Sequence, residues 1–313
     1  MNFHQTFRHA LKSAALIIAL ALVAAPDAPA QGTRGAKARA GGGKDSGASR
    51  FATLDGARVH YKSFGKGEEA VVFVHGWTCN LDFWRMQTPA FAARTRVVAL
   101  DLPGHGQSDK PESFNYSMDL FARAVDAVMR DAGVKRAVLV GHSMGTPVVR
   151  QFYRRHPEKT LALVFVDGAL RPFAPRATME QFVAPLRANY PEASARMVDA
   201  MLQPVKSDAL RAEVRAAMLS TPRHVAVSAM EGMIDEANWK EDEIRVPVLA
   251  IHARSPFWGA DYEQFVRRLA PRADFQIWDG VSHFLMMDEP VKFNRAVGDF
   301  LDANRLPGGA KKK

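Results

Sequence analysis

The sequence predicts an α/β fold, a mostly parallel β-sheet covered by helices on both sides. Two observations carry this prediction. Short apolar runs rich in β-branched residues, such as Ala70–Val74 and Leu161–Val166, recur along the chain and suit strands buried on both faces. Segments with helical spacing separate these runs, and strands that alternate with helices form a parallel sheet. With 313 residues, the chain is long enough for one large domain of this kind or two smaller ones.

Seven strands are expected. The first, over Ala57–Ser63, alternates apolar and polar side chains after a turn at Asp55-Gly56, which is typical of an early antiparallel strand. The buried strands that follow are Ala70–Val74, Arg96–Leu100, Ala137–Val140, Leu161–Val166, Val246–Ile251 and Asp274–Trp278. The helices expected around them are Leu81–Ala93, Met118–Ala132, Thr146–His156, Asp261–Leu269 and Pro290–Asn304.

Residues 171–240 interrupt this alternation. They contain no buried-strand run, and prolines punctuate segments with helical spacing. The expected helices are Met179–Ala188, Glu192–Leu202, Ser207–Leu219 and Val225–Glu236. The simplest account is a helical insertion between the core strands Leu161–Val166 and Val246–Ile251, which we number six and seven.

The basic residues lie mainly in the tails. Of the formal charge of +9, residues 1–30 carry +1, residues 31–50 carry +4 and residues 311–313 carry +3, which leaves +1 for residues 51–310. The folded body therefore gives no electrostatic reason to expect a nucleic-acid partner, although the tails could contact anionic surfaces weakly. Nothing in the sequence fixes the oligomeric state.

The first 30 residues have the pattern of an export signal. Arg8 and Lys12 precede an apolar run over Ala14–Ala25 that is short for a membrane span. Ala28-Pro29-Ala30 supplies small residues for cleavage after Ala30. We expect a periplasmic or secreted protein; the alternative is an uncleaved N-terminal anchor.

The rest of the chain divides by composition. Residues 31–50 are rich in Gly, Ala, Lys and Arg and contain almost no large apolar side chains to bury, which favours a flexible linker. The only cysteine, Cys79, excludes an intramolecular disulfide. The expected parts are a signal peptide at 1–30, a linker at 31–50, a core at 51–170 and 241–306, a helical cap at 171–240 and a basic tail at 307–313.

Ser143 lies in the sequence Gly141-His142-Ser143-Met144-Gly145, between an expected strand and an expected helix. A strand, a sharp turn and a helix are the context in which a Gly-x-Ser-x-Gly pattern indicates a nucleophile. The glycines suit a turn too crowded for side chains. The helix N-terminus after Ser143 favours developing negative charge. A coincidental Gly-Ser-Gly turn is the alternative.

Four motifs together resemble the α/β-hydrolase fold superfamily over residues 51–305. They are His75-Gly76-Trp77, Asp101-x-x-Gly104-x-Gly106-x-Ser108, Gly141-His142-Ser143-Met144-Gly145 and Gly280-x-x-His283. Each motif alone is weak to moderate, but their order and spacing make a strong signal. The resemblance implies an α/β-hydrolase fold with a helical cap after strand six.

His283 is the expected base. A serine hydroxyl needs a base within hydrogen-bond reach, and His283 follows the last strand, at the edge where loops after parallel strands converge. The resemblance implies that the backbone N–H groups of Trp77 and Met144 form the oxyanion hole.

The acid departs from the common pattern of the superfamily. The stretch after strand seven, His252-Ala253-Arg254-Ser255-Pro256, contains no carboxylate. Asp167, at the end of strand six, is the favoured acid because a strand end holds geometry firmly. Asp261, later in the loop after strand seven, is the alternative. The acid must accept a hydrogen bond from Nδ1 of His283 to fix the tautomer.

The pocket is expected to be modest in size and mostly apolar. Methionines of the cap offer adaptable surface, although methionines at helical spacing more often pack in a core. The residues expected at the pocket are His75, Phe182, Phe257 and Trp258. We expect no cofactor and no metal, because the sequence has neither a metal-ligand cluster nor a phosphate-binding glycine loop.

The sequence thus predicts a serine hydrolase that cleaves a small, mostly apolar carboxylic ester or related acyl bond through an acyl-serine intermediate. Within the same fold, the alternatives are hydrolysis of a carbon–carbon bond and cofactor-free peroxidation. A ligand-binding protein with little turnover is the alternative from another class.

Overall fold

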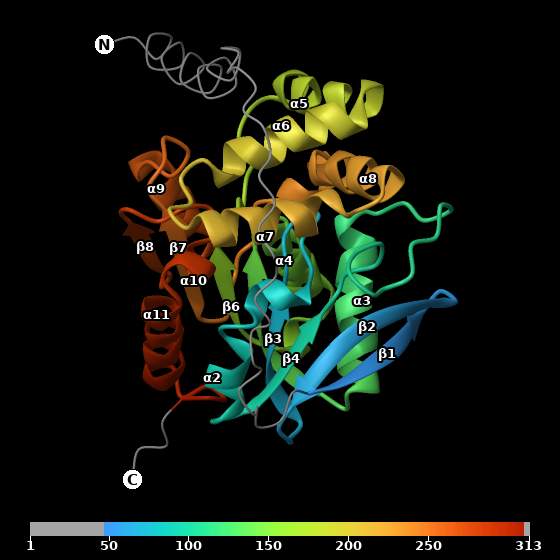
Figure 1. Ribbon diagram of the computed structural model, residues 1–313. Coiled ribbons are helices and arrows are strands. Elements are labelled where there is room, and N and C mark those ends of the chain that lie inside the picture. The colour runs from blue at the N-terminus through green and yellow to red at the C-terminus, as the bar shows by residue number, and fades with distance from the viewer. Residues whose placement is uncertain (1–46, 310–313) are drawn as a thin grey trace. The chain divides into compact units, whose positions relative to one another are not determined.

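The computed structural model describes residues 47–309. Its centre is an eight-stranded sheet with the strand order β1-β2-β4-β3-β5-β6-β7-β8 (Figure 1). The strands are β1 (Ala48–Leu54), β2 (Ala57–Phe64), β3 (Glu69–Val74), β4 (Arg96–Leu100), β5 (Arg136–His142), β6 (Thr160–Val166), β7 (Val248–Ala253) and β8 (Asp274–Trp278). β1 and β2 pair antiparallel, and so do β2 and β4. All other pairs are parallel, which confirms the predicted fold class.

The central strands are buried on both faces because their residues are almost all apolar. Every residue of β7 is buried, and in β3, β5 and β6 only one residue in each strand is not. Since β3, β5, β6 and β7 run in parallel, their carboxyl ends meet at one edge of the sheet. Loops after these strands therefore converge there.

Helices cover the sheet. α4 packs on β5 and β6 and against α3, while α2 packs on β4. The helices of the core are α2 (Thr88–Ala92), α3 (Met118–Asp131), α4 (Gly145–Arg155), α9 (Ala260–Leu269), α10 (Leu285–Asp288) and α11 (Pro290–Ala303), with 3₁₀ turns η2 (Leu81–Trp84) and η3 (Pro157–Lys159).

Four helices lie between β6 and β7, where the sequence analysis expects the helical insertion. They are α5 (Arg176–Ala188), α6 (Tyr190–Leu202), α7 (Asp208–Leu219) and α8 (Arg223–Met233), followed by the 3₁₀ turn η4 (Glu236–Trp239). Figure 1 shows them beyond the carboxyl ends of the central strands. The insertion is tied to the loop after β3, because the Trp77 indole donates to the carbonyl of Ala226 (2.8 Å) and the Thr221 hydroxyl donates to that of Thr78 (3.2 Å).

Two elements near the N-terminal end of the described residues differ in kind from the prediction. β1 was not predicted, and it begins at Ala48, inside the stretch expected to be linker. Its first four residues are exposed, so an edge strand of this kind carries no apolar signature. The helix predicted over Leu81–Ala93 is instead the turn η2 and the short helix α2, and Pro89 lies at the start of α2.

The predicted signal peptide, most of the predicted linker and residues 310–313 lie outside the described residues. Within residues 47–309, no helix is long and apolar enough to cross a membrane.

Candidate active site

Ser143 occupies a strained turn between β5 and α4. Its φ is +53°, in the left-handed region that costs energy for a residue with a side chain. Glycines make this turn possible. A Cβ on Gly141 would lie 2.3 Å from the carbonyl oxygen of Gly145, and one on Gly145 would lie 2.5 Å from that of Val74. The turn presents a partly exposed hydroxyl at the N-terminus of α4.

Asp167 follows β6 directly and is also held at positive φ, +45°. Its side chain is 7% exposed. Oδ1 accepts hydrogen bonds from the backbone N–H of Ala253 (2.9 Å) and the indole N–H of Trp258 (2.9 Å). Burial alone would raise the pKa of Asp167, but hydrogen bonding and charge interaction with His283, together with the hydrogen bond from the backbone of Ala253, hold its pKa below the ordinary value.

His283 reaches Asp167 from the loop after β8. Its Nδ1 donates to Oδ2 of Asp167 at 2.6 Å. This bond leaves Nε2 as the nitrogen that can accept a proton. The structure therefore brings together His283 and the favoured acid from positions 116 residues apart.

His142 holds the loop of His283 beside the nucleophile turn. It immediately precedes Ser143, its Nε2 donates to the backbone carbonyl of His283 (2.8 Å), and the two rings are 4.7 Å apart. Burial lowers the pKa of His142 to about 3, so its ring is neutral at neutral pH.

The hydroxyl of Ser143 and Nε2 of His283 do not form a hydrogen bond in this structure, and neither atom bonds to another group within residues 47–309. Catalytic hydrogen bonds are often long or poorly aligned until substrate binds. Proton transfer between them would therefore require a movement of the Ser143 or His283 side chain that brings the two atoms into hydrogen-bond distance.

Two backbone N–H groups beside Ser143 are free to bind an oxyanion. Neither Trp77 nor Met144 donates its backbone N–H to an acceptor within the described residues. The loop that carries Trp77 lies tightly against Ser143, because a Cβ on Gly76 would be 3.0 Å from Cβ of Ser143. This arrangement suits stabilisation of negative charge on a tetrahedral intermediate.

The other acid candidate lies apart from this set. Asp261, on α9, has a side chain that is 73% exposed and forms an ion pair with Arg171. This ion pair holds the pKa of Asp261 below its ordinary value. The Asp261 side chain forms no hydrogen bond or ion pair with His283.

The residues predicted to line the pocket have different surroundings. His75 is buried; its Nδ1 donates to the carbonyl of Gly76 (2.8 Å) and its Nε2 accepts from the backbone N–H of Leu102 (3.0 Å). Phe182, on α5, is half-buried, and Phe257 is 44% exposed. Trp258 is buried and bonds Asp167, a positioning role that the sequence analysis missed.

His252, at the end of β7, is a second residue that the sequence analysis missed. It is buried, its ring lies 4.4 Å from that of Trp258, and its Nδ1 is 3.8 Å from Oδ1 of Asp167. Burial lowers the pKa of His252 to about 4, so it is neutral at neutral pH. No motif marks His252 or Trp258, because their partner lies far away in the sequence.

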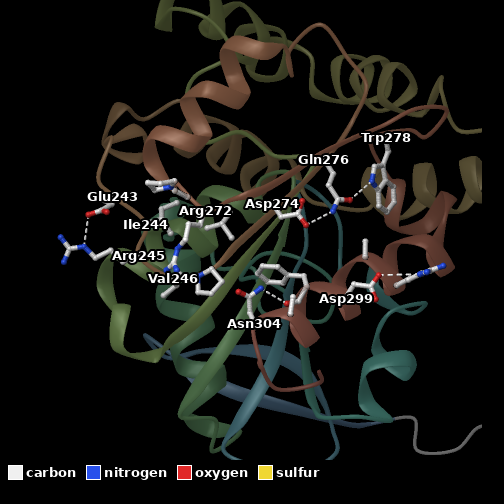
Figure 2. Close-up of a pocket in the computed structure, with 18 of the residues that line it drawn as sticks. Glu243, Ile244, Arg245, Val246, Arg272, Asp274, Gln276, Trp278, Asp299 and Asn304 are labelled. Atoms are coloured by element: carbon white, nitrogen blue, oxygen red, sulfur yellow. Dashed lines mark hydrogen bonds and ion pairs between the residues drawn. The ribbon is translucent and has the colours of Figure 1, made fainter. Parts of the chain in front are cut away.

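A large groove lies elsewhere on the molecule. It measures about 1000 Å³ and is lined by Glu243–Val248, β8 and α11 (Figure 2). Its lining runs from the segment before β7 along β8 as far as Trp278, and it includes neither Ser143 nor His283. Within residues 47–309, no group of three or more His, Cys, Asp or Glu side chains is arranged to hold a metal ion.

Comparison with known proteins gives the family. The alpha/beta hydrolase fold family matches residues 69–240. The chain is 30% identical over 270 residues to a 2-hydroxy-6-oxononadienedioate/2-hydroxy-6-oxononatrienedioate hydrolase of Burkholderia vietnamiensis, covering 78% of this chain and 91% of that protein. A shorter match is to the dihydrolipoyllysine-residue acetyltransferase component of the acetoin cleaving system of Cupriavidus necator. The two are 40% identical over 120 residues, which is 38% of this chain and only 32% of that protein.

A solved structure gives a further comparison. Est816, described as an N-acyl homoserine lactone degrading enzyme, aligns with a TM-score of 0.68 at 25% identity, covering 80% of this chain and all of that one. The chain therefore belongs to the alpha/beta hydrolase fold family and is a hydrolase.

Proposed function

We propose that the chain hydrolyses a small, mostly apolar carboxylic ester, or a related acyl bond such as a lactone, through an acyl-serine intermediate. The observation that carries this proposal is the 2.6 Å hydrogen bond between Asp167 and His283, held beside Ser143 in its strained turn. A buried carboxylate, an imidazole and a serine presented at the head of a helix are the components of nucleophilic acyl transfer.

In the proposed reaction, each residue of the candidate site has one role. Ser143 Oγ attacks the acyl carbon while Nε2 of His283 takes its proton, and Asp167 stabilises the imidazolium through Nδ1. The N–H groups of Trp77 and Met144 bind the oxyanion. His283 then gives the proton to the leaving alcohol. Water, activated by the same ring, releases the acid from Ser143.

A small acyl or alcohol group fits the surroundings of the site better than a polymer. The four helices α5–α8 lie over the carboxyl ends of the strands, and Trp77 is hydrogen-bonded to α8. Their half-buried methionines, Met179, Met197, Met201 and Met233, supply adaptable apolar surface.

Hydrolysis of a carbon–carbon bond is the second candidate. The Burkholderia relative, whose name gives a 2-hydroxy-6-oxo dienedioate as substrate, is 30% identical over 91% of its length. The same histidine and oxyanion donors would serve that reaction. Cofactor-free peroxidation and ligand binding with little turnover remain the further alternatives.

A substrate panel tests the proposal. Wild type and Ser143→Ala would be assayed on 4-nitrophenyl esters of acetate to decanoate, on N-acyl homoserine lactones and on a 2-hydroxy-6-oxo dienoate. We expect ester or lactone hydrolysis that depends on Ser143. Turnover of the dienoate alone would favour carbon–carbon cleavage. Binding without turnover of any compound would favour the ligand-binding alternative.

We also propose that the protein is exported. Arg8, Lys12 and the apolar run that follows them support this proposal, and the Ala28-Pro29-Ala30 sequence supports cleavage after Ala30. Cell fractionation and N-terminal sequencing of the mature chain test it. An uncleaved chain in the membrane fraction would favour the anchor instead.

A further inference from the structure

A second serine, histidine and aspartate are linked by hydrogen bonds, away from the strand ends that carry Ser143 and Asp167. Ser49 lies on β1, His60 on β2, and Asp101 directly after β4. The Ser49 hydroxyl lies 2.9 Å from Nε2 of His60, and Nδ1 of His60 lies 2.7 Å from Oδ2 of Asp101. Unlike the pair at Ser143, this serine and histidine are already hydrogen-bonded.

The aspartate is built to stay ionised. Asp101 follows β4, and its side chain is 2% exposed. Besides His60, it accepts from the backbone N–H groups of Leu81 (2.7 Å) and Gln107 (2.9 Å). Burial alone would raise the pKa of Asp101, but the hydrogen bond from His60, the charge interaction with His75 and these amides together hold it below the ordinary value.

An ionised Asp101 fixes the orientation of His60. A carboxylate only accepts, so Nδ1 of His60 carries a proton, and in the tautomer that leaves Nε2 unprotonated this nitrogen faces the Ser49 hydroxyl as an acceptor. This is the arrangement in which an imidazole acts as base toward a serine. His60 is fully buried, whereas Ser49 is exposed, so the serine is the part of the set that a reagent can reach.

The surface beside Ser49 suits an aromatic group. Phe51, on the same face of β1, is 39% exposed and lies over His60 at 5.1 Å. The guanidinium of Arg58 lies 4.9 Å from the Phe51 ring. An aryl group can therefore stack at the position next to the nucleophile.

We propose that Ser49 is a second nucleophile, activated by His60 and Asp101, which captures acyl groups from activated aryl esters. Oγ of Ser49 forms a bond to the acyl carbon, the bond from that carbon to the aryl oxygen breaks, and the phenol leaves. The proton of Ser49 passes to Nε2 of His60 and from there to the aryl oxygen as it leaves.

The adduct is expected to persist. Ser49 has no positive φ and no glycine-flanked turn at a helix N-terminus like that of Ser143. His60 is fully buried, and among residues 47–309 only Ser49 forms a hydrogen bond with its Nε2, so an acyl group on Ser49 would shield this base from water. Ser49 therefore takes up about one acyl group per chain and does not turn over.

The test uses full-length Ser143→Ala, so that its outcome is independent of the proposed function. The protein is exposed to 4-nitrophenyl acetate, phenolate release is followed, and acetylated residues are located by tandem mass spectrometry. We expect a single burst and acetylation at Ser49. Adding Ser49→Ala should abolish both, and Ser49→Thr should retain them in part.

Thr53 is the matched control because it is an exposed hydroxyl on the same face of β1, opposite Arg58 and without a histidine partner. Adding Thr53→Ala should change nothing. His60→Gln or His60→Asn should slow acetylation of Ser49 by about 100-fold, with circular dichroism and melting temperature used to select the variant that stays folded. Acetylation of Ser49 no faster than of Thr53, or an unchanged rate in the folded His60 variant, would overturn the proposal.

Discussion

Replacing Asp167 by asparagine should almost abolish hydrolysis, and the geometry says why. Oδ1 of Asp167 accepts from two N–H groups, those of Ala253 and Trp258. The asparagine oxygen must take that position, so its NH₂ group faces Nδ1 of His283. Two donors cannot bond each other, and His283 therefore shifts to the tautomer with the proton on Nε2, which cannot accept the proton of Ser143.

The expected loss follows from this tautomer change. An aspartate-to-asparagine change that leaves a triad in the wrong tautomer costs about 10⁴-fold in kcat. At 1.36 kcal/mol per tenfold, this is roughly 5.5 kcal/mol of barrier. KM should change little, because Asp167 is buried behind His283 and does not face the substrate.

Asp261→Asn is the matched control. Its carboxylate is exposed and forms a surface ion pair with Arg171, and such pairs contribute about 0–1 kcal/mol. The kcat of this variant should stay close to wild type. Both variants would be assayed for kcat and KM on the best ester of the panel, with melting temperature as the check on folding. A large loss in Asp261→Asn with wild-type kcat in Asp167→Asn would refute the assignment of the acid.

Three further outcomes are expected. Trp258→Phe removes one hydrogen-bond donor to Asp167, so kcat should fall about tenfold or more. The acid limb of the pH–rate profile should also move to higher pH. An unchanged profile would contradict a positioning role for Trp258. Gly76→Ala should lower kcat more than it lowers the melting temperature, because the new Cβ would be 3.0 Å from Cβ of Ser143; wild-type kcat would mean that this contact relaxes freely. Burial lowers the pKa of His142 to about 3 in the folded chain. As pH falls below about 6.5, His142 is therefore protonated in the unfolded chain but not in the folded one. The free energy of unfolding should then fall by about 1.4 kcal/mol per pH unit from this group, and urea titrations of His142→Gln should show a shallower dependence; equal slopes would contradict it.

The strands of the central sheet could be predicted because burial on both faces requires continuous apolar runs. β3, β4 and β8 match the expected runs within one residue at either end. β1 could not be predicted in this way, because an exposed edge strand is stabilised by its backbone pairing with β2 and needs few apolar residues.

The parts of the candidate site that depend only on local sequence could be predicted. The turn at Ser143 and the strand end before Asp167 place side chains at the carboxyl edge of a parallel sheet, and that rule needs only local sequence. The bond from Trp258 to Asp167 joins residues 91 apart, and the set Ser49, His60 and Asp101 spans three strands. Such contacts depend on the register and packing of the folded chain, which sequence patterns do not specify.

Covalent labelling of Ser143 tests the central claim most directly. Wild type and Ser49→Ala would be treated with a fluorophosphonate, and adduct formation at Ser143 would be followed together with ester hydrolysis. We predict that modification of Ser143 and loss of hydrolysis proceed at the same rate in both proteins, and that Asp167→Asn reacts far more slowly. Full hydrolysis after Ser143 is modified, or repeated turnover of ester by Ser143→Ala beyond a single burst, would contradict the account.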